Sequence, residues 1–135
     1  MNIKPMRFLV VEDHPEVAQN NCDFLKKFDS SAICSIASTP QEAIQRLKIE
    51  TPDLIVLDLQ FASPSGSQSA KSSLELLELI IDTYTSLNIL IYSSEPAWMI
   101  KFVKSINHHC GGFVVVNKFS SMWYLFWCFY FSFLY

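Results

Sequence analysis

Leu54-Ile55-Val56-Leu57-Asp58 is the stretch that decides the fold of this 135-residue chain. Consecutive apolar residues that end on a carboxylate are typical of a strand buried on both faces of a parallel sheet. Phe8-Leu9-Val10-Val11-Glu12-Asp13 has the same form. Strand signals alternate with helical patterns along the chain, which predicts right-handed βαβ units and one parallel sheet. The predicted strands are 7–12, 31–37, 53–58, 88–93 and 112–117.

Acidic residues follow two of these predicted strands. In an open α/β sheet, ligands bind outside the carboxyl ends of the strands, where the strand order reverses. If the two strands are neighbours, Glu12, Asp13 and Asp58 share one small cleft, and their charges repel unless a hard cation lies between them. The pattern therefore predicts a site of the Mg²⁺ type, with one carboxylate left for chemistry. Solvated strand ends are the alternative for acidic residues at these positions.

Length and composition narrow the class of protein. The chain has the size of one domain. Its net charge of -3 and pI near 5.5, without a Lys/Arg cluster, argue against nucleic-acid binding. Cys22, Cys34, Cys110 and Cys128 have no CxxC spacing, and no signal peptide precedes the first strand. We therefore expect free thiols and a cytoplasmic location.

Four helices are predicted between the strands. The first begins near Pro15, and its apolar stripe is Val17, Phe24, Leu25 and Phe28. The second begins with Thr39-Pro40-Gln41-Glu42, which has capping-box spacing. The third is expected from Ser72, after a Ser-rich surface loop over 59–71. The fourth is expected from Pro96, with a core stripe of Trp98, Met99, Phe102, Val103 and Ile106.

The predicted strands 7–12, 53–58, 88–93 and 112–117 end at or directly before, respectively, the acidic pair, Asp58, Ser93 and Lys118. In this order these residues resemble the response-regulator receiver domain of two-component signalling, in the chemotaxis-regulator-like superfamily, over residues 7 to 118. The resemblance implies an α/β, doubly wound, five-stranded parallel sheet with strand order 2-1-3-4-5, flavodoxin-like, with helices on both faces. The opening Val-Val-Glu-Asp-His-Pro is similar to receivers that carry a helix-turn-helix output domain, so loss of such a domain stays open.

The resemblance also implies roles for individual residues. Asp58 would accept a phosphoryl group from a histidine kinase or a phosphotransfer protein. Mg²⁺ would be held by Glu12, Asp13, Asp58 and the main-chain carbonyl of Gln60. Magnesium prefers oxygen ligands, so this set is chemically suitable. Phosphorylation of Asp58 would then switch the binding of a partner.

Two further side chains would contact the phosphoryl group. Lys118 would supply a positive charge, and Ser93 would supply a hydroxyl. Ser94 is adjacent, and the choice between the two serines stays open, although Ser93 directly follows the predicted strand. Receivers place an aromatic switch residue three positions before the lysine, where this chain has Val115. Phe113 is the expected replacement, because side chains in a strand repeat every two residues.

Histidines and cysteines offer weaker candidates. His14 beside the acidic pair is interpreted as a loop residue rather than a metal ligand. His108-His109-Cys110 resembles half of a zinc site, but the sequence has no second pair of ligands. We expect this trio to be structural.

The predicted receiver domain spans 1–119, and 120–135 form an atypical aromatic-rich segment that replaces or degrades the fifth helix. The thirteen residues from Trp123 to Tyr135 carry no charge and are too few for a membrane span. Each belongs to a residue type with a codon beginning in T, so our interpretation is a frameshift product. A helix that faces a partner or lipid is the alternative.

Three functions compete. The preferred one is a phosphorylated receiver, which is not itself an enzyme, binds no nucleic acid and could form a homodimer. The second is a pseudo-receiver, an interaction module that takes no phosphoryl group. The third is a small Mg²⁺-dependent phosphatase or phosphotransferase. It ranks last, because Gln60 lies where such an enzyme needs a general acid.

Overall fold

The computed structural model describes residues 4–59, 68–93 and 102–117, with side chains for all of these except 68–72, 93 and 117. Strands and helices alternate, as the apolar pattern predicts. The elements are β1 (Arg7–Val11), α1 (Pro15–Lys26), β2 (Ile33–Ala37), α2 (Pro40–Ile49), β3 (Leu54–Leu59), α3 (Gln68–Thr83), β4 (Asn88–Ser93), α4 (Val103–His108) and β5 (Phe113–Asn117).

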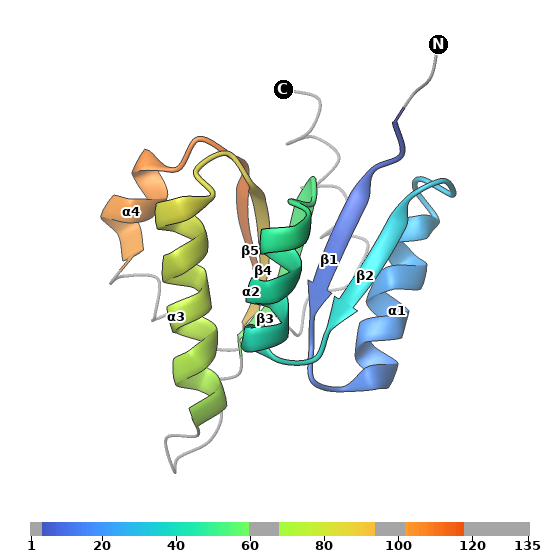
Figure 1. The fold of residues 1–135 in the computed structure, drawn as a ribbon, viewed down its shortest axis with the longest axis horizontal. Coiled ribbons are helices and arrows are strands. Elements are labelled where there is room, and N and C mark those ends of the chain that lie inside the picture. The colour runs from blue at the N-terminus through green and yellow to red at the C-terminus, as the bar shows by residue number, and fades with distance from the viewer. Residues whose placement is uncertain (1–3, 60–67, 94–101, 118–135) are drawn as a thin grey trace.

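The five strands form one parallel sheet in the order β2-β1-β3-β4-β5, which confirms the predicted topology (Figure 1). The chain moves from β1 outward to β2 and then returns to place β3 on the other side of β1. The strand order therefore reverses between β1 and β3. The carboxyl ends of these two strands meet at that point, which is where ligands bind in open α/β sheets.

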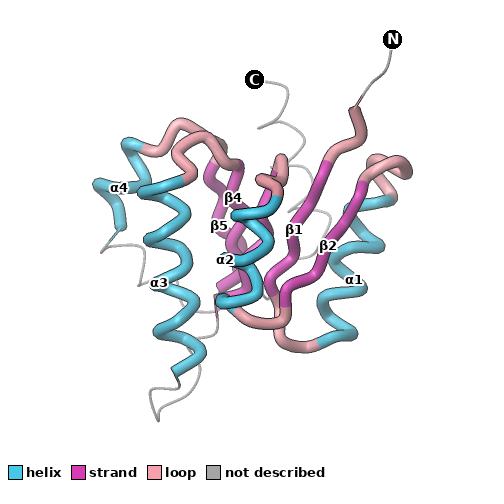
Figure 2. The backbone as a smooth tube through the Cα atoms, viewed as in Figure 1, coloured by secondary structure: helices cyan, strands magenta, loops and turns pink. Residues whose placement is uncertain are grey.

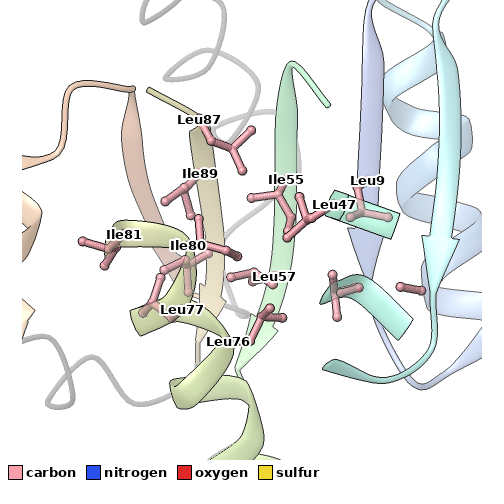
Figure 3. Packing of buried hydrophobic residues seen from close by; sticks show 14 of the residues in the cluster. Leu9, Leu47, Ile55, Leu57, Leu76, Leu77, Ile80, Ile81, Leu87 and Ile89 are labelled. Carbon is pink, nitrogen blue, oxygen red and sulfur yellow. The ribbon is translucent and has the colours of Figure 1, made fainter. Parts of the chain in front are cut away.

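Helices cover the sheet on both faces (Figure 2). Two apolar clusters mark the two interfaces. The larger cluster joins alternate strand residues to α2 and α3, with Phe102 and Ile106 of the α4 region packed against it. Figure 3 shows its side chains from β1, β3 and β4 meeting those from α2 and α3. The smaller cluster lies under α1 and contains the intervening strand residues.

β3 shows why a continuous apolar run predicts a strand buried on both faces. Ile55, Leu57 and Leu59 belong to the α2–α3 cluster, whereas Leu54 and Val56 belong to the cluster under α1. All five side chains are buried. Burying a side chain of this size contributes about 1.5–3 kcal/mol relative to leaving it exposed. The strand runs one residue beyond the predicted range of 53–58, so Asp58 lies inside β3 rather than at its end.

The predicted cap of α2 is confirmed. Thr39 Oγ1 accepts a hydrogen bond from the Glu42 N–H at 3.1 Å, and Pro40 is the first helical residue. The Glu42 carboxylate accepts hydrogen bonds from both the main-chain N–H and the hydroxyl of Ser38, at 3.0 Å each. The capping carboxylate therefore reaches back one residue further than the usual capping box.

The predicted stripe of α1 is wrong for two of its four members. Val17 is 45% exposed and Phe28 is 41% exposed, whereas the buried residues are Ala18, Asn21 and Cys22. Small side chains allow a helix backbone to approach a sheet closely, so the contact face follows Ala18 and Cys22 instead of the larger residues. Of the predicted stripe, Leu25 packs against the cluster under α1.

The third and fourth helices also differ from prediction in detail. α3 begins at Gln68, four residues before the predicted Ser72, so 68–71 extend the helix instead of the loop. The predicted start of the fourth helix at Pro96, with Trp98 and Met99, lies outside the described residues. Val103 is 47% exposed and is not part of the core. Within the described ranges, none of the helices is both long and apolar enough to cross a membrane.

The expectation of free thiols is wrong for two of the four cysteines. Cys22 of α1 and Cys34 of β2 form a disulfide with Cα atoms 5.8 Å apart. Cys110 is free and exposed, and Cys128 lies outside the described residues. The spacing of 12 residues gives no local signal for the bond. Only the packing of α1 against the sheet brings the two sulfur atoms together.

Candidate metal centre

The register between β1 and β3 brings two predicted acidic residues level with one another. Val11 pairs with Leu57, so Glu12 and Asp58, each one residue later, lie at the same height. The Glu12 N–H donates to the Ala37 carbonyl at 3.0 Å, which fixes the chain just beyond β1. Because strand side chains alternate, both carboxyl groups lie on the α1 face of the sheet.

Glu12 is an unusual glutamate because it is buried, with 4% of its surface exposed. Burial, together with hydrogen bonds to the side chains of Asp58 and Asp13, raises the pKa of its carboxyl to about 8. The His14 N–H, 3.1 Å from Glu12 Oε1, acts in the opposite direction. Near neutral pH without a cation, Glu12 therefore holds a proton.

Asp13 is the exposed member of the pair. Partial burial alone would raise the pKa of Asp13, but the hydrogen bond with Glu12 and the charge of His14 outweigh it and lower that pKa. Asp13 is therefore ionised beside a protonated Glu12. Two neighbouring acidic groups whose pKa values move apart are a mark of a functional site.

His14 takes a larger part in this site than its sequence interpretation implies. It is the N-cap residue of α1, and its ring Nδ1 lies 3.0 Å from Glu12 Oε1 and 2.9 Å from Asp13 Oδ1. The hydrogen bond with Glu12, followed by the charges of Asp13 and Glu12, raises the pKa of His14. One potential ligand atom from each of these three residues lies within 4.8 Å of the others.

Tyr92 is the residue of this site that sequence reasoning missed. It pairs directly with Asp58 in the β3–β4 register and packs at the edge of the cluster on the α1 face. Burial, with the charge of Asp58, raises the pKa of its phenol. The sequence offered one clue to this role, namely that Tyr92 directly precedes Ser93 in a strand adjacent to β3.

The remaining predicted residues are placed only in part. Ser93 is the last residue of β4, and its Cα pairs with Leu59 of β3 and Asn117 of β5. Its main chain thus lies one residue beyond the level of Asp58. The other three predicted positions lie outside the described residues: Gln60, Ser94 and Lys118.

The aromatic candidate on β5 lies on the predicted face. Phe113 and Val115 both pack against the α2–α3 cluster, so they share one side of the strand. This agrees with the argument that a shift of two residues keeps the side-chain direction. That Phe113 takes the role of the switch aromatic expected at position 115 stays a prediction.

His108 and His109 behave as expected for structural residues. His109 Nε2 lies 2.6 Å from the Leu87 carbonyl oxygen, which ties the loop before β5 to the start of β4. His108 Nδ1 lies 2.8 Å from the Lys104 carbonyl oxygen in the preceding turn of α4. Both imidazoles thus contact main-chain oxygens.

The donor set of the acidic cluster, Glu12, Asp13 and Asp58, fits Mg²⁺. Three carboxyl groups lie where the strand order reverses. Without a cation, the proton on Glu12 reduces the repulsion between these carboxyl groups, and a bound cation would do the same. Carboxylate oxygens are the ligands that Mg²⁺ prefers, and an exposed Asp13 leaves room for metal-bound waters. The imidazole of His14 suits transition metals better than Mg²⁺.

Comparisons with known proteins agree with this architecture. The family profile described as response regulator receiver domain matches residues 8–115. The probable C4-dicarboxylate response regulator DctR of Bacillus subtilis (strain 168) is 32% identical over 63 residues, which cover 47% of this chain and 28% of that protein. The protein of the same name from Priestia megaterium is 32% identical over 66 residues, or 49% of this chain and 29% of its own length.

The matched segment spans less than a third of these two relatives. Solved structures cover far more of the chain. A response regulator from Thermotoga maritima has a TM-score of 0.69 at 20% identity, covering 96% of this chain and 98% of its own. Chemotaxis response regulator CheY4 of Vibrio cholerae has a TM-score of 0.70 at 16% identity, covering 96% and 99%. With the fold, the acidic cleft and the profile match in agreement, this chain belongs to the response regulator receiver domain family.

Proposed function

We propose that this chain accepts a phosphoryl group on Asp58 in a Mg²⁺-dependent phosphorelay, and that phosphorylation switches the binding of a partner. The observation that carries this proposal is the register of β1 and β3. It brings Glu12 level with Asp58 at the point where the strand order reverses. A nucleophile and a metal-binding carboxylate are thereby held in one cleft by rigid strands.

Asp58 acts as the nucleophile in this proposal. One of its carboxylate oxygens attacks the phosphorus of a phosphohistidine, and the imidazole of the donor leaves as the new bond forms. When bound, Mg²⁺ neutralises charge on the transferred group. To hold the cation, Glu12 would have to be deprotonated, because a protonated carboxyl cannot serve as an anionic ligand. Asp13, already ionised, would attract the cation without losing a proton.

The partners follow from this chemistry. The donor is a histidine kinase or a phosphotransfer protein, because a receiver takes its phosphoryl group from a phosphohistidine. Gln60 would supply a main-chain carbonyl to the metal, Lys118 would neutralise the phosphoryl oxygens, and Ser93 would hydrogen-bond them. In this proposal the chain is a phosphoacceptor and not an independent enzyme. The new dianionic group then biases the surrounding elements between two arrangements.

Intact-mass spectrometry tests the proposal directly. Wild-type chain is incubated with Mg²⁺ and acetyl phosphate, and we expect a mass increase of one phosphoryl group. Asp58→Asn should abolish the increase. Asp82→Asn, which changes an exposed aspartate of α3, is the matched control and should leave it intact. Asp13→Ala should raise the Mg²⁺ concentration needed for labelling while the nucleophile remains.

The alternative is a pseudo-receiver that binds a partner without phosphorylation. Folded wild-type chain that shows no mass increase with either acetyl phosphate or a phosphorylated donor domain would support it. Labelling that persists in Asp58→Asn would instead refute the assignment of the nucleophile.

A further inference from the structure

The Cys22–Cys34 disulfide links α1 and β2, the two elements that flank the acidic stretch 12–14, although Cys34 pairs with Phe8, four residues before Glu12. Cys22 is in α1, which begins directly after the acidic stretch 12–14, and Cys34 is in β2. Their Cα atoms are 5.8 Å apart, inside the range of ordinary disulfides. Both residues pack in the cluster under α1. The bond therefore fixes α1 to the sheet from within the core.

The two cysteine side chains differ in how accessible they are to a small thiol in solution. Cys22 is buried, with 2% of its surface exposed. Cys34 is half-buried and lies on β2, which is an edge strand of the sheet. Thiol–disulfide exchange requires the attacking sulfur to reach the bond in line. A small thiol can therefore approach from Cys34, whereas Cys22 is shielded by its helix.

β2 and α1 together hold the acidic stretch at its two ends. On one side, the Glu12 N–H donates to the carbonyl of Ala37, the last residue of β2. On the other side, the Ala18 N–H donates to the His14 carbonyl at 3.0 Å, which joins the stretch to the first turn of α1. The disulfide bonds α1 covalently to β2, the same strand that anchors Glu12.

We propose that Cys22 and Cys34 form a thiol–disulfide exchange site whose reagent is a low-molecular-weight thiol and its disulfide. Its oxidation state sets how firmly α1 holds the acidic stretch. The link to metal affinity rests on the proposed function, but the exchange chemistry does not. Closing the bond restricts α1, and opening it leaves two small thiols in a packed core.

The chemistry balances without any group beyond this reagent. In the forward direction, one cysteine thiolate attacks a small-molecule disulfide, forms a mixed disulfide and releases one small thiol. The second cysteine then attacks the protein sulfur of that mixed disulfide, closes the Cys22–Cys34 bond and releases the second small thiol. The two protein thiols are oxidised, and one disulfide is reduced to two thiols. In reverse, one small thiolate opens the Cys22–Cys34 bond to a mixed disulfide, and a second small thiolate attacks the small-molecule sulfur, which releases the reduced protein and one small-molecule disulfide.

The first test measures exchange itself. The full chain carrying Cys110→Ser and Cys128→Ser is equilibrated in glutathione buffers of graded ratio, alkylated and weighed intact. We expect interconversion of a dithiol and an intramolecular disulfide. Cys22→Ser, which leaves Cys34, should form a mixed disulfide with glutathione several-fold faster than Cys34→Ser, which leaves Cys22. Equal rates, or a dithiol that stays reduced at every ratio, would overturn the proposal.

The second test measures the consequence for α1. Hydrogen exchange read by mass spectrometry should be faster over residues 12–28 in the reduced protein, and unchanged over α3. The melting temperature should fall by roughly 5–10 °C on reduction. The concentration of Mg²⁺ needed for half-maximal stabilisation should rise several-fold. Equal protection of 12–28 in both redox states would refute control of α1.

These readouts separate two kinds of failure. Glutathione exchange and hydrogen exchange need neither Mg²⁺ nor a phosphoryl donor. If both behave as expected while Asp58 is never labelled, the proposed function fails and the exchange site stands. If Asp58 is labelled equally well in both redox states and residues 12–28 are equally protected, the redox inference fails and the receiver function stands.

Discussion

Glu12→Gln should stabilise the metal-free protein at alkaline pH. Glutamine keeps the size of the buried side chain and can hydrogen-bond, but it never ionises. In the wild type, burial raises the pKa of Glu12 from 4.5 to about 8, and hydrogen bonds with Asp58 and Asp13 contribute in the same direction. Ionisation of this group therefore works against the folded state.

The direction in which stability changes with pH follows from the number of protons that the folded and unfolded states bind. Between pH 4.5 and about 8, folded protein retains the Glu12 proton that the unfolded chain has released. Stability therefore falls as pH rises through this window. Each pKa unit corresponds to about 1.4 kcal/mol, so the whole shift sets an upper limit of about 5 kcal/mol. Structural relaxation and entry of water make the actual change smaller than this limit. We therefore expect the wild type to lose about 2–3 kcal/mol of stability between about pH 5.5 and about pH 8.5.

His14 acts in the same direction. Its contacts with Glu12 and Asp13 raise its pKa, so the stability that it contributes is present at low pH and is lost as pH rises through the folded-state value. Since glutamine at position 12 also removes the carboxyl charge that raises the pKa of His14, the variant should have a flatter pH profile on both counts.

Urea unfolding in the presence of a chelator measures the effect. The stability of Glu12→Gln relative to wild type should increase by about 2–3 kcal/mol from about pH 5.5 to about pH 8.5, or about 1 M or more in urea midpoint. Glu78→Gln, at an exposed position of α3, is the matched control and should follow the wild-type profile. Mg²⁺ should stabilise wild type more than Glu12→Gln. If wild type and Glu12→Gln lose stability in parallel, the assignment of a buried, protonated Glu12 is refuted.

Two glycines before β5 and the threonine cap of α2 give further tests of the fold. Gly111→Ala should destabilise the protein by about 2 kcal/mol or more, because a Cβ there would overlap the main-chain carbonyl of Leu87. Gly112→Ala should cost less in the same thermal melt, since its Cβ would meet only a side-chain oxygen at 3.1 Å, and an equal loss would contradict this account. Thr39→Ala should cost about 1 kcal/mol through loss of the α2 cap. Thr51→Ala, at an exposed loop position, should be nearly neutral, and a similar loss in both threonine variants would exclude capping as the cause.

The sequence alone determined the strands, their parallel arrangement and the cap of α2. Each depends on residues close together in the chain. A continuous apolar run such as 54–57 can be satisfied only by burial on both faces, and a threonine before a proline can cap a helix wherever that helix lies. The placement of Glu12 beside Asp58 also followed, because parallel strands present their carboxyl ends at the same edge.

Only the tertiary structure decided which side of α1 meets the sheet, the pairing of Cys22 with Cys34, and the protonation of Glu12. None of these has a local signature. The face of α1 depends on how closely its backbone approaches β1 and β2, which favours small residues over the larger apolar ones of the predicted stripe. The pKa of Glu12 depends on how much water reaches it and on neighbours from other strands, and both arise from packing between segments far apart in the sequence.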